Sequence, residues 1–264
     1  MIASPADLQP GLNDLVDRVA QQQREDFGHM ASALKADGTL ITACDRWSDA
    51  TLVSGLAELF PDEGVLSEEG RKLVPSTSAY WVVDPLDGTT NFASGIPYWA
   101  ISLARFEKGL PVLSILDVPP LGQRIVAIRG KGAWRNGKTL HPPSRHMHPS
   151  DCASLCSRSI GVLQKLPDRP FPGKIRLLGV ASLNLVSVAM GQTVAALEAT
   201  PKIWDLAAAW LVLTELGCPM RWLLEQPEAL APGTDLSERD FPLLVADRPT
   251  TLERFMPWAD ALLS

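Results

Sequence analysis

One short string constrains this chain more than any other feature: Asp84-Pro85-Leu86-Asp87-Gly88-Thr89-Thr90-Asn91-Phe92, which directly follows the apolar run YWVV. The run is typical of a buried strand, so the string begins where a strand ends and the chain turns at Pro85. A buried unpaired carboxylate is very costly, and two neighbouring carboxylates repel each other. Both stay ionised there if a cation joins them, and hard divalent cations such as Mg²⁺ prefer oxygen ligands. Gly88 and Thr89 then supply a close-approach glycine and a hydroxyl at an expected helix start, where free backbone N–H groups suit a phosphate.

This string has two other possible interpretations. In the first, the aspartates only cap backbone amides of a turn, which is the usual case for a bare D-x-x-D-G. Here the string is longer, and acids elsewhere in the chain match it. In the second, Asp84 is a nucleophile that forms an aspartyl-phosphate. Phosphatases of that kind use D-x-D, whereas Pro85 and Leu86 separate Asp84 from Asp87, so we do not assign Asp84 this role.

The periodicity of apolar residues predicts a layered protein. Helical spacing indicates helices over 6–34 and 46–60, with an extended segment near 37–44 and a short strand in GVLSEEG. Strand-like runs follow from 79 to 129, and RNGK at 135–138 is a hairpin-turn signal. Sheets with helices laid against them indicate an α/β or α+β fold.

The Pro- and His-rich stretch 141–150 is the expected boundary between two halves. An N-terminal α+β half, residues 1–145, would carry the metal-binding motifs, and a C-terminal α/β half, residues 146–264, would complete one compact catalytic unit. In the second half we expect strands near 153–157, 194–198 and 242–246, and helices near 181–190, 205–217 and 250–263.

Charge and composition argue against several classes of protein. With 30 Asp+Glu against 24 Lys+Arg, the net charge of −6 argues against a general nucleic-acid binder, which needs a basic footprint. The start of the chain shows no secretory signal, and its apolar runs fall short of the about 18–20 residues of a membrane helix. Four cysteines do not make a disulfide scaffold, and they indicate reduced thiols in a cytoplasmic protein.

Several motifs together resemble the inositol monophosphatase family, the Mg²⁺-dependent, lithium-sensitive phosphomonoesterases. The D-P-L-D-G-T-T-N-F string resembles the family signature, and Ser67-Glu68-Glu69-Gly70 resembles its G-E-E-S with the flanking Gly and Ser exchanged. IWDLAA at 203–208 resembles the element W-D-x-A-[AG], and GKGAWRNG at 130–137 resembles a G-x-G-A-x-x-N-G hairpin. Lys35 and TACD at 42–45 resemble the region before the family's second helix. The similarity runs from about residue 10 to 220 in family order.

The resemblance implies a site for two to three Mg²⁺ ions. Glu68, Asp84 and the backbone carbonyl of Leu86 would ligate the first ion. Asp84 would bridge to a second ion held by Asp87 and Asp205, and Glu68 would also hold a weaker third ion through water.

The resemblance also implies how the reaction proceeds. The nucleophile would be a water made acidic by the cation, and Thr89, hydrogen-bonded to Asp45, would orient or deprotonate it. Glu68 would take part in catalysis through the first ion. Backbone amides of Gly88 and Thr89 would hold phosphate oxygens, the attack would be in-line, and no phosphoenzyme would form. The second ion would stabilise the leaving alkoxide, which then takes a proton from water.

Two further residues are expected beside the leaving group, in addition to Asp87 and Asp205, which would also contact the substrate. Glu198 lies seven residues before Asp205 at the end of the strand-like run TVAALEA, a spacing at which the family places a glutamate on a hydroxyl of the leaving group. Ala181 matches a position that lines the same pocket. The structural alternatives are a strand-end acid and plain helix packing.

The implied fold is an αβαβα sandwich, and the implied assembly is a homodimer. The expected substrate is a small phosphorylated metabolite, with inositol 1-phosphate first because Thr90-Asn91-Phe92 resembles the inositol phosphatases. Histidinol phosphate, fructose 1,6-bisphosphate and 3′-phosphoadenosine 5′-phosphate remain alternatives. A regulatory, protein-binding member with little activity is the alternative of another class, although all the expected ligands are present.

Two other groups of residues are not assigned a site. His141, His146 and His148 lie in an exposed-looking Pro-rich segment in which Asp151 is the nearest acid. Cys152 and Cys156 lack the C-x-x-C spacing of redox pairs and are interpreted as structural.

Overall fold

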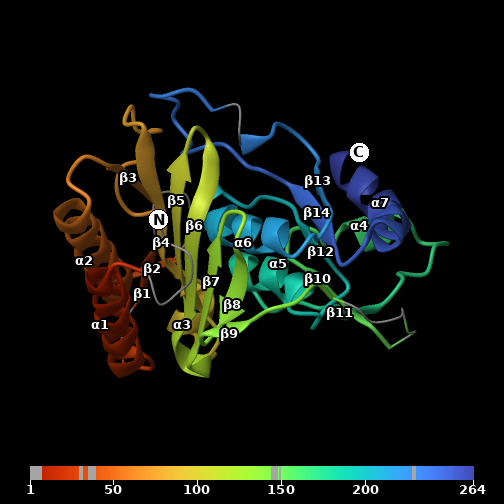
Figure 1. The fold of residues 1–264 in the computed structure, drawn as a ribbon. Helices are drawn as coiled ribbons and strands as arrows, with labels where there is room; N and C mark the ends of the chain where they lie inside the picture. Colours follow the sequence, from red (N-terminus) through yellow and green to blue (C-terminus); the bar gives the residue numbers. More distant parts are fainter. Residues whose placement is uncertain (1–7, 30–31, 35–39, 144–147, 149, 228–229) are drawn as a thin grey trace.

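The structure is a computed structural model of the chain, and it describes residues 8–29, 32–34, 40–143, 148, 150–227 and 230–264. Helices and sheets alternate in five layers (Figure 1). Helices α1 (Pro10–Asp26) and α2 (Ala43–Leu59) form one outer layer, and α4 (Val162–Lys165) and α7 (Pro249–Leu263) form the other. Helices α5 (Ala181–Ala189) and α6 (Ile203–Glu215) lie between the two larger sheets. The predicted αβαβα sandwich is therefore confirmed.

The first large sheet comes entirely from the N-terminal half. Its seven strands follow chain order, and only the β3–β4 pair is parallel. The strands are β3 (Gly64–Ser67), β4 (Ala79–Asp87), β5 (Ala100–Glu107), β6 (Leu110–Val118), β7 (Gln123–Ile128), β8 (Gly132–Arg135) and β9 (Lys138–Thr139). The hairpin predicted at RNGK joins β8 to β9, and Asn136 (φ 49°) and Gly137 (φ 75°) both take the left-handed conformation that a tight hairpin turn favours. A short 3₁₀ helix, η2 (Pro119–Leu121), connects β6 to β7.

The second large sheet has five strands in the order β11-β10-β12-β14-β13. They are β11 (Lys174–Arg176), β10 (Cys152–Leu155), β12 (Ala195–Glu198), β14 (Leu243–Ala246) and β13 (Met220–Trp222). Strand β10 runs parallel to β11 and β12, and β14 runs antiparallel to β12 and β13. The remaining elements are a small pair, β1 (Ser32–Leu34) and β2 (Leu40–Thr42), and the short helix α3 (Thr89–Ala93).

Helix α6 joins the two halves because nearly every side of it is buried. Trp204, Trp210 and the alanines 207–209 are at most 4% exposed, and they belong to one hydrophobic core with residues of β4 to β8 and of β12 and β14. A helix that is apolar on all sides needs neighbours on all sides. The expected division at residue 145 thus falls between the sheets, but α5 and α6 of the second half complete the packing of the first. The division itself stays a prediction.

One expected helix was wrong at its end. The predicted helix over 6–34 is α1, which ends at Asp26, and residues 32–34 form β1. Phe27 has extended dihedrals (φ −58°, ψ 126°), and its ring stacks on Trp99 with centroids 4.7 Å apart. This tertiary contact turns the chain, and Gly28 follows with a φ of 80°. Helix α2 also begins earlier than predicted, at Ala43, because Thr42 and Asp45 form a capping box.

The second half follows the prediction more closely. The expected strands near 153–157, 194–198 and 242–246 are β10, β12 and β14, and the expected helices are α5, α6 and α7. The short elements α4, β11 and β13 were not predicted, because runs of three or four residues carry too little periodicity.

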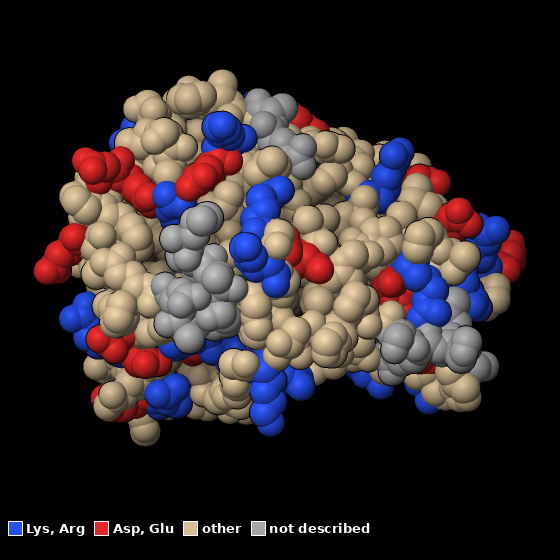
Figure 2. All heavy atoms as spheres, in the orientation of Figure 1, with Lys and Arg blue, Asp and Glu red and all other residues tan. Residues whose placement is uncertain are grey.

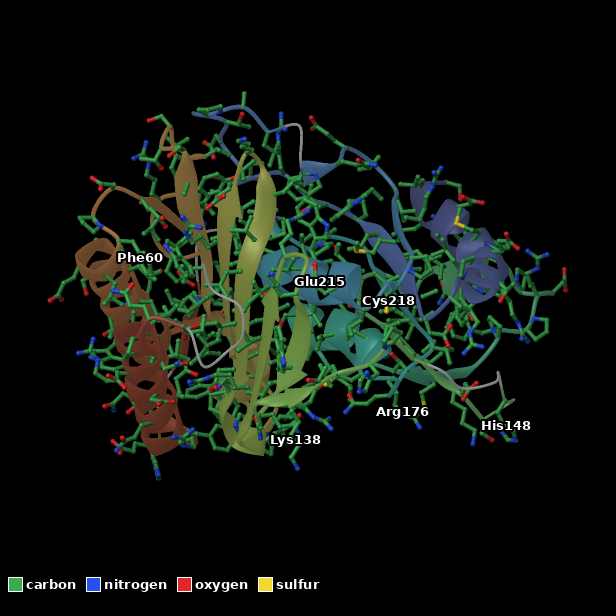
Figure 3. All side chains as sticks on the ribbon, viewed as in Figure 1. Phe60, Lys138, His148, Arg176, Glu215 and Cys218 are labelled. Carbon is green, nitrogen blue, oxygen red and sulfur yellow. The ribbon has the colours of Figure 1, made fainter. Side chains whose placement is uncertain are left out.

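The end of α6 also explains the glycines of the GKGAWRNG motif. Glu215 accepts hydrogen bonds from the backbone N–H groups of Gly130 (2.8 Å) and Gly132 (2.9 Å). Figure 3 shows Glu215 on α6, facing the sheet hairpins. Both glycines have positive φ, so their freedom lets the turn present two amides to one carboxylate.

The surface carries both charge signs. On the face drawn in Figure 2, basic and acidic side chains are interspersed among uncharged ones. No helix in the described part of the chain is both long and apolar enough to cross a membrane.

Candidate active site

Three predicted acids meet at the carboxyl end of β4. Asp84 and Asp87 belong to β4, and Asp205 lies in the first turn of α6. One oxygen atom of each carboxylate lies within 4.8 Å of the others. Asp84 and Asp87 are buried and Asp205 is partly buried. The fold therefore brings together residues that are 118 positions apart in the chain (205 − 87).

Asp84 is the most enclosed member of this acid cluster, at 1% exposure. Its Oδ1 accepts a hydrogen bond from the backbone N–H of Leu86 (3.0 Å), whereas its buried Oδ2 has no hydrogen-bond partner among the described residues. Burial, followed by the charges of Glu68, Asp87 and Asp205, holds the pKa of Asp84 well above its ordinary range. A buried oxygen without a partner needs an explanation, and a role as a cation ligand would provide one.

Asp87 is held by the start of α5. Its Oδ1 accepts from the backbone N–H of Ala181 (3.3 Å) and its Oδ2 from that of Ser182 (2.7 Å). These bonds satisfy amides that a helix start leaves without partners. Burial nevertheless raises the pKa of Asp87 to about 6, against the lowering effect of the Ser182 contacts.

Asp205 and Glu68 complete the acidic group from two other elements. The backbone N–H of Lys202 donates to Asp205 Oδ2 (2.8 Å), which fixes that carboxylate at the helix start. Burial, then the charges of Asp87 and Glu68, raise the pKa of Asp205 well above normal. Glu68 follows β3, where its backbone N–H donates to Val83 O (3.1 Å). Its carboxylate lies outside the 4.8 Å cluster but acts on the pKa of all three aspartates.

These residues fit a hard divalent cation. The donor set is carboxylate oxygen with a backbone carbonyl, that of Leu86, in the same bulged segment of β4. Four neighbouring carboxylates that repel one another, two of them on buried residues, are stabilised by a cation. Oxygen-only donors suit Mg²⁺ better than softer ions.

Asp45 and Thr89 also lie together, as the resemblance implies. Thr89 Oγ1 donates to Asp45 Oδ1 (2.7 Å) and lies 3.2 Å from the carbonyl oxygen of Leu86. Asp45 is 1% exposed, and its Oδ2 accepts from the backbone N–H (2.8 Å) and the hydroxyl of Thr42. Because Asp45 is fixed from both sides, the Thr89 hydroxyl is fixed too, and its lone pairs stay available.

Gly88 cannot be replaced without strain. Its φ is 106°, and a Cβ there would lie 2.8 Å from Val180 Cγ2 and 3.3 Å from the carbonyl oxygen of Tyr98. Only glycine suits both the left-handed backbone and this close approach. The chain can therefore turn from β4 into α3 directly beside Asp87, which places the Gly88 and Thr89 amides near the acid cluster.

Glu198 lies at the end of β12, 3% exposed. The side chain of Asn184 donates to its Oε1 (2.8 Å). Burial, with a contribution from the charge of Asp87, raises the pKa of Glu198 to about 8. Glu198 and Asp87 thus influence each other, and Ala181, the first residue of α5, donates its backbone N–H to Asp87.

The histidine segment and Lys35 do not belong to the site as the structure describes it. His141 and His148 are exposed, and Figure 3 shows His148 at the edge of the molecule, beyond β11. Lys35 and His146 lie outside the described residues. The four cysteines are free thiols.

Sequence reasoning missed two buried polar residues near the site, Asn184 and Gln23. Asn184 interrupts the apolar run of α5 and is 1% exposed. Gln23 continues the buried stripe of Leu12, Val16 and Val19 along α1 and is fully buried. An amide at a core position of a helix was the available signal, because such a group needs polar partners inside the protein.

Comparison with known proteins indicates one family. The model of the inositol monophosphatase family matches residues 8–242. A histidinol-phosphatase of Mycobacterium tuberculosis is 32% identical over 217 residues, which cover 77% of this chain and 82% of that protein. A putative Nus factor SuhB of Neisseria meningitidis is also 32% identical, over 69% of this chain and 73% of its own length.

A solved structure supports the fold and the enzyme class. The structure of an IMPase/NADP phosphatase complexed with Mg²⁺ and phosphate superimposes with a TM-score of 0.76 at 26% identity, covering 92% of each chain. The predicted class, a phosphoric monoester hydrolase, is confirmed at the level of the family. The chain belongs to the inositol monophosphatase family.

Proposed function

We propose that this chain is a Mg²⁺-dependent phosphomonoesterase that hydrolyses a small polyol or sugar-like phosphate, with inositol 1-phosphate as the first candidate. The observation that carries the proposal is the cluster of the buried Asp84 and Asp87 with the partly buried Asp205, in which Asp84 Oδ2 has no partner among the described residues. The neighbouring Thr89–Asp45 hydrogen bond supplies the group that handles a proton.

Each ligand has a proposed place. Glu68, Asp84 and the Leu86 carbonyl would hold a first ion, and Asp84, Asp87 and Asp205 a second, with Glu68 reaching a third through water. When bound, the ions would lower the pKa of the attacking water and neutralise charge on the phosphate. The backbone amides of Gly88 and Thr89 would hold phosphate oxygens.

Thr89 and Asp45 would manage the proton of the attacking water. Since the Thr89 hydroxyl donates to Asp45 Oδ1, its lone pair can accept a hydrogen bond from that water and orient it towards phosphorus. As the new P–O bond forms, the water proton would pass to Thr89 Oγ1 and the hydroxyl proton to Asp45. The ester P–O bond would break on the opposite side, and the leaving alkoxide would take a proton from solvent water. Because positioning and charge supply most of the catalysis, no covalent intermediate is needed.

The substrate-binding residues would act on the leaving group. Glu198, held by Asn184, would accept a hydrogen bond from a hydroxyl of the polyol, and Ala181 would line the same pocket. A hydroxylated leaving group is therefore favoured. The two relatives and the solved structure bear different names, so the substrate must be found by assay.

The assay is phosphate release from inositol 1-phosphate, histidinol phosphate, fructose 1,6-bisphosphate and 3′-phosphoadenosine 5′-phosphate, each with Mg²⁺, with EDTA, and with Mg²⁺ plus Li⁺. We expect Mg²⁺-dependent release that is strongest for one compound, inhibited by Li⁺, and lost in D87N. Full Mg²⁺-dependent turnover by D87N would refute the proposed site.

A regulatory, protein-binding role is the second candidate. The similarity to a protein called a putative Nus factor favours it. Absence of release from every compound, in protein shown to be folded, would favour either a phosphomonoester outside this panel or the regulatory role. We also propose a homodimer and a cytoplasmic location, which light scattering and cell fractionation test.

A further inference from the structure

Gln23 makes a fully buried connection between three elements around the acid cluster. Its amide is 0% exposed. Nε2 donates to Pro85 O (2.7 Å) and to Ser48 Oγ (3.1 Å), and Oε1 accepts from Trp99 Nε1 (3.0 Å). Both amide protons and the amide oxygen are therefore engaged, which is the condition under which a polar side chain is tolerated in a core.

The contact to Pro85 meets a need that the strand creates. In the β4–β5 pairing, Asp84 lies opposite Ser102 and Asp87 opposite Ala100. Three steps along β4 thus match two along β5, so β4 carries one extra residue and bulges between its two aspartates. A carbonyl in a bulge loses its partner in the ladder, and at Pro85 the side chain of Gln23 replaces that partner.

The Pro85–Leu86 peptide group passes this constraint on to Asp84. Its carbonyl oxygen accepts from Gln23, and its N–H donates to Asp84 Oδ1 (3.0 Å). Because the two ends of a planar trans peptide point in opposite directions, one rigid unit separates Gln23 from the carboxylate. The bond to Oδ1 leaves Asp84 Oδ2 as the oxygen without a partner among the described residues. The same peptide plane restricts Leu86, whose own carbonyl is a proposed ligand.

The contact to Ser48 connects this peptide to the helix that carries Asp45, which with Thr89 is proposed to accept the proton of the attacking water. Ser48 lies on α2 three residues after Asp45 and is 0% exposed. On the other side, Trp99 packs against Phe27 and Phe92 with ring centroids 4.7 and 5.0 Å away, so its N–H is a fixed donor. Trp99 thus holds the amide oxygen of Gln23. The amide nitrogen joins α2, which carries Asp45, to the bulge of β4 that follows Asp84.

We propose that Gln23 is a positioning residue for the metal centre: its amide fixes the Pro85–Leu86 peptide, and through it the orientation of Asp84 and of the Leu86 carbonyl. The inference rests on the proposed function, because it assumes that these oxygens bind the cation. Groups that orient metal ligands in this way typically change metal affinity by about 10- to 100-fold when removed.

The experiment compares Gln23→Met with wild type and with Gln21→Met. Gln21 lies on the exposed side of the same helix and bonds only to Glu25 in the contacts described, so Q21M controls for the substitution itself. Mn²⁺ is added to EDTA-treated, dialysed protein, and free Mn²⁺ is followed by electron paramagnetic resonance. We expect the dissociation constant of Q23M to be about 10-fold or more above that of wild type and Q21M.

A second readout separates positioning from general destabilisation. With the best substrate, Q23M should need at least about 10-fold more Mg²⁺ for half-maximal rate, with kcat at saturating Mg²⁺ changed much less. Circular dichroism establishes that the variant is folded at the assay temperature. Should Q23M not fold, Q23L takes its place, because a leucine side chain is apolar and cannot donate to Pro85 O.

The outcomes are distinct. Folded Q23M or Q23L that binds Mn²⁺ as wild type does would overturn the inference and leave the proposed function standing. Wild-type protein that binds no Mn²⁺ would overturn both. Weaker Mn²⁺ binding by Q23M with an unchanged Q21M supports the inference.

Discussion

Replacement of Glu198 by glutamine tests the electrostatics of the proposed leaving-group pocket. Glu198 is 3% exposed, and burial, followed by the charge of Asp87, raises its pKa from 4.5 to about 8. Glutamine keeps the shape of the side chain and the carbonyl oxygen that accepts from Asn184. The substitution therefore removes the ionisable proton and little else.

The sign of the effect on stability follows from proton binding. Between pH 4.5 and about 8 the folded carboxyl keeps its proton, whereas the unfolded one has released it. Unfolding therefore releases a proton in this range, and rising pH favours the unfolded state. The favourable contribution is complete below pH 4.5 and is lost progressively up to about pH 8.

The size of the change in unfolding free energy follows from how steeply that free energy depends on pH. One pH unit is worth about 1.36 kcal/mol for one proton. Because pH 5 and pH 7 both lie between the two pKa values, wild type loses about 2.7 kcal/mol over this interval through Glu198. E198Q loses none of it, so the difference in unfolding free energy, E198Q minus wild type, should increase by that amount from pH 5 to pH 7.

The assay is urea unfolding at pH 5, 6 and 7 in EDTA, followed by tryptophan fluorescence. All other titrating groups are common to the two proteins, and E253Q, at an exposed position of α7, serves as control. Parallel pH profiles for wild type and E198Q would refute the reasoning.

The remaining predictions concern the acid cluster and its supports. Asp84→Asn should raise the thermal midpoint in EDTA at pH 8, because it removes a buried carboxylate whose pKa burial and neighbouring acids raise, and it should abolish the Mg²⁺-induced shift; an unchanged shift in scanning calorimetry contradicts this. Gly70→Ser should destabilise by about 1–3 kcal/mol, because a Cβ there would lie 2.6 Å from Ser67 Oγ, and adding Ser67→Gly should restore stability in the same urea assay. Glu215→Ala should lose about 1.5–3 kcal/mol through its bonds to two glycine amides, with kcat unchanged; a lower kcat in folded protein would argue against a purely structural role.

The Ser67–Gly70 exchange shows how a departure from the family pattern is accommodated. The family's G-E-E-S reads S-E-E-G here. A Cβ at position 70 would meet the Ser67 hydroxyl, so the turn has space for a serine side chain at position 67 or at position 70 but not at both. Here position 67 carries the serine and position 70 the glycine. The Glu68 backbone between them still pairs with Val83 O.

Local chemistry made much of the candidate site predictable. The string from Asp84 to Thr89 places two acids, a glycine and a hydroxyl at a strand end, and each choice answers a local requirement for charge, backbone freedom or hydrogen bonding. The hairpin at RNGK and the helices α5, α6 and α7 were predictable for the same reason, because turn residues and apolar periodicity act over a few positions.

The sequence by itself determined the chemical character of this protein: a chain with paired carboxylates after a buried strand, and with motifs in the order of one phosphatase family. Only the tertiary structure decided which acids meet within 4.8 Å, that Phe27 ends α1 by stacking on Trp99, and that Gln23, of three consecutive glutamines, is the one that supports Pro85. The physical reason is distance along the chain. Propensity and periodicity act over a few residues, whereas desolvation, carboxylate repulsion and the pairing of buried amides depend on neighbours that only folding brings together.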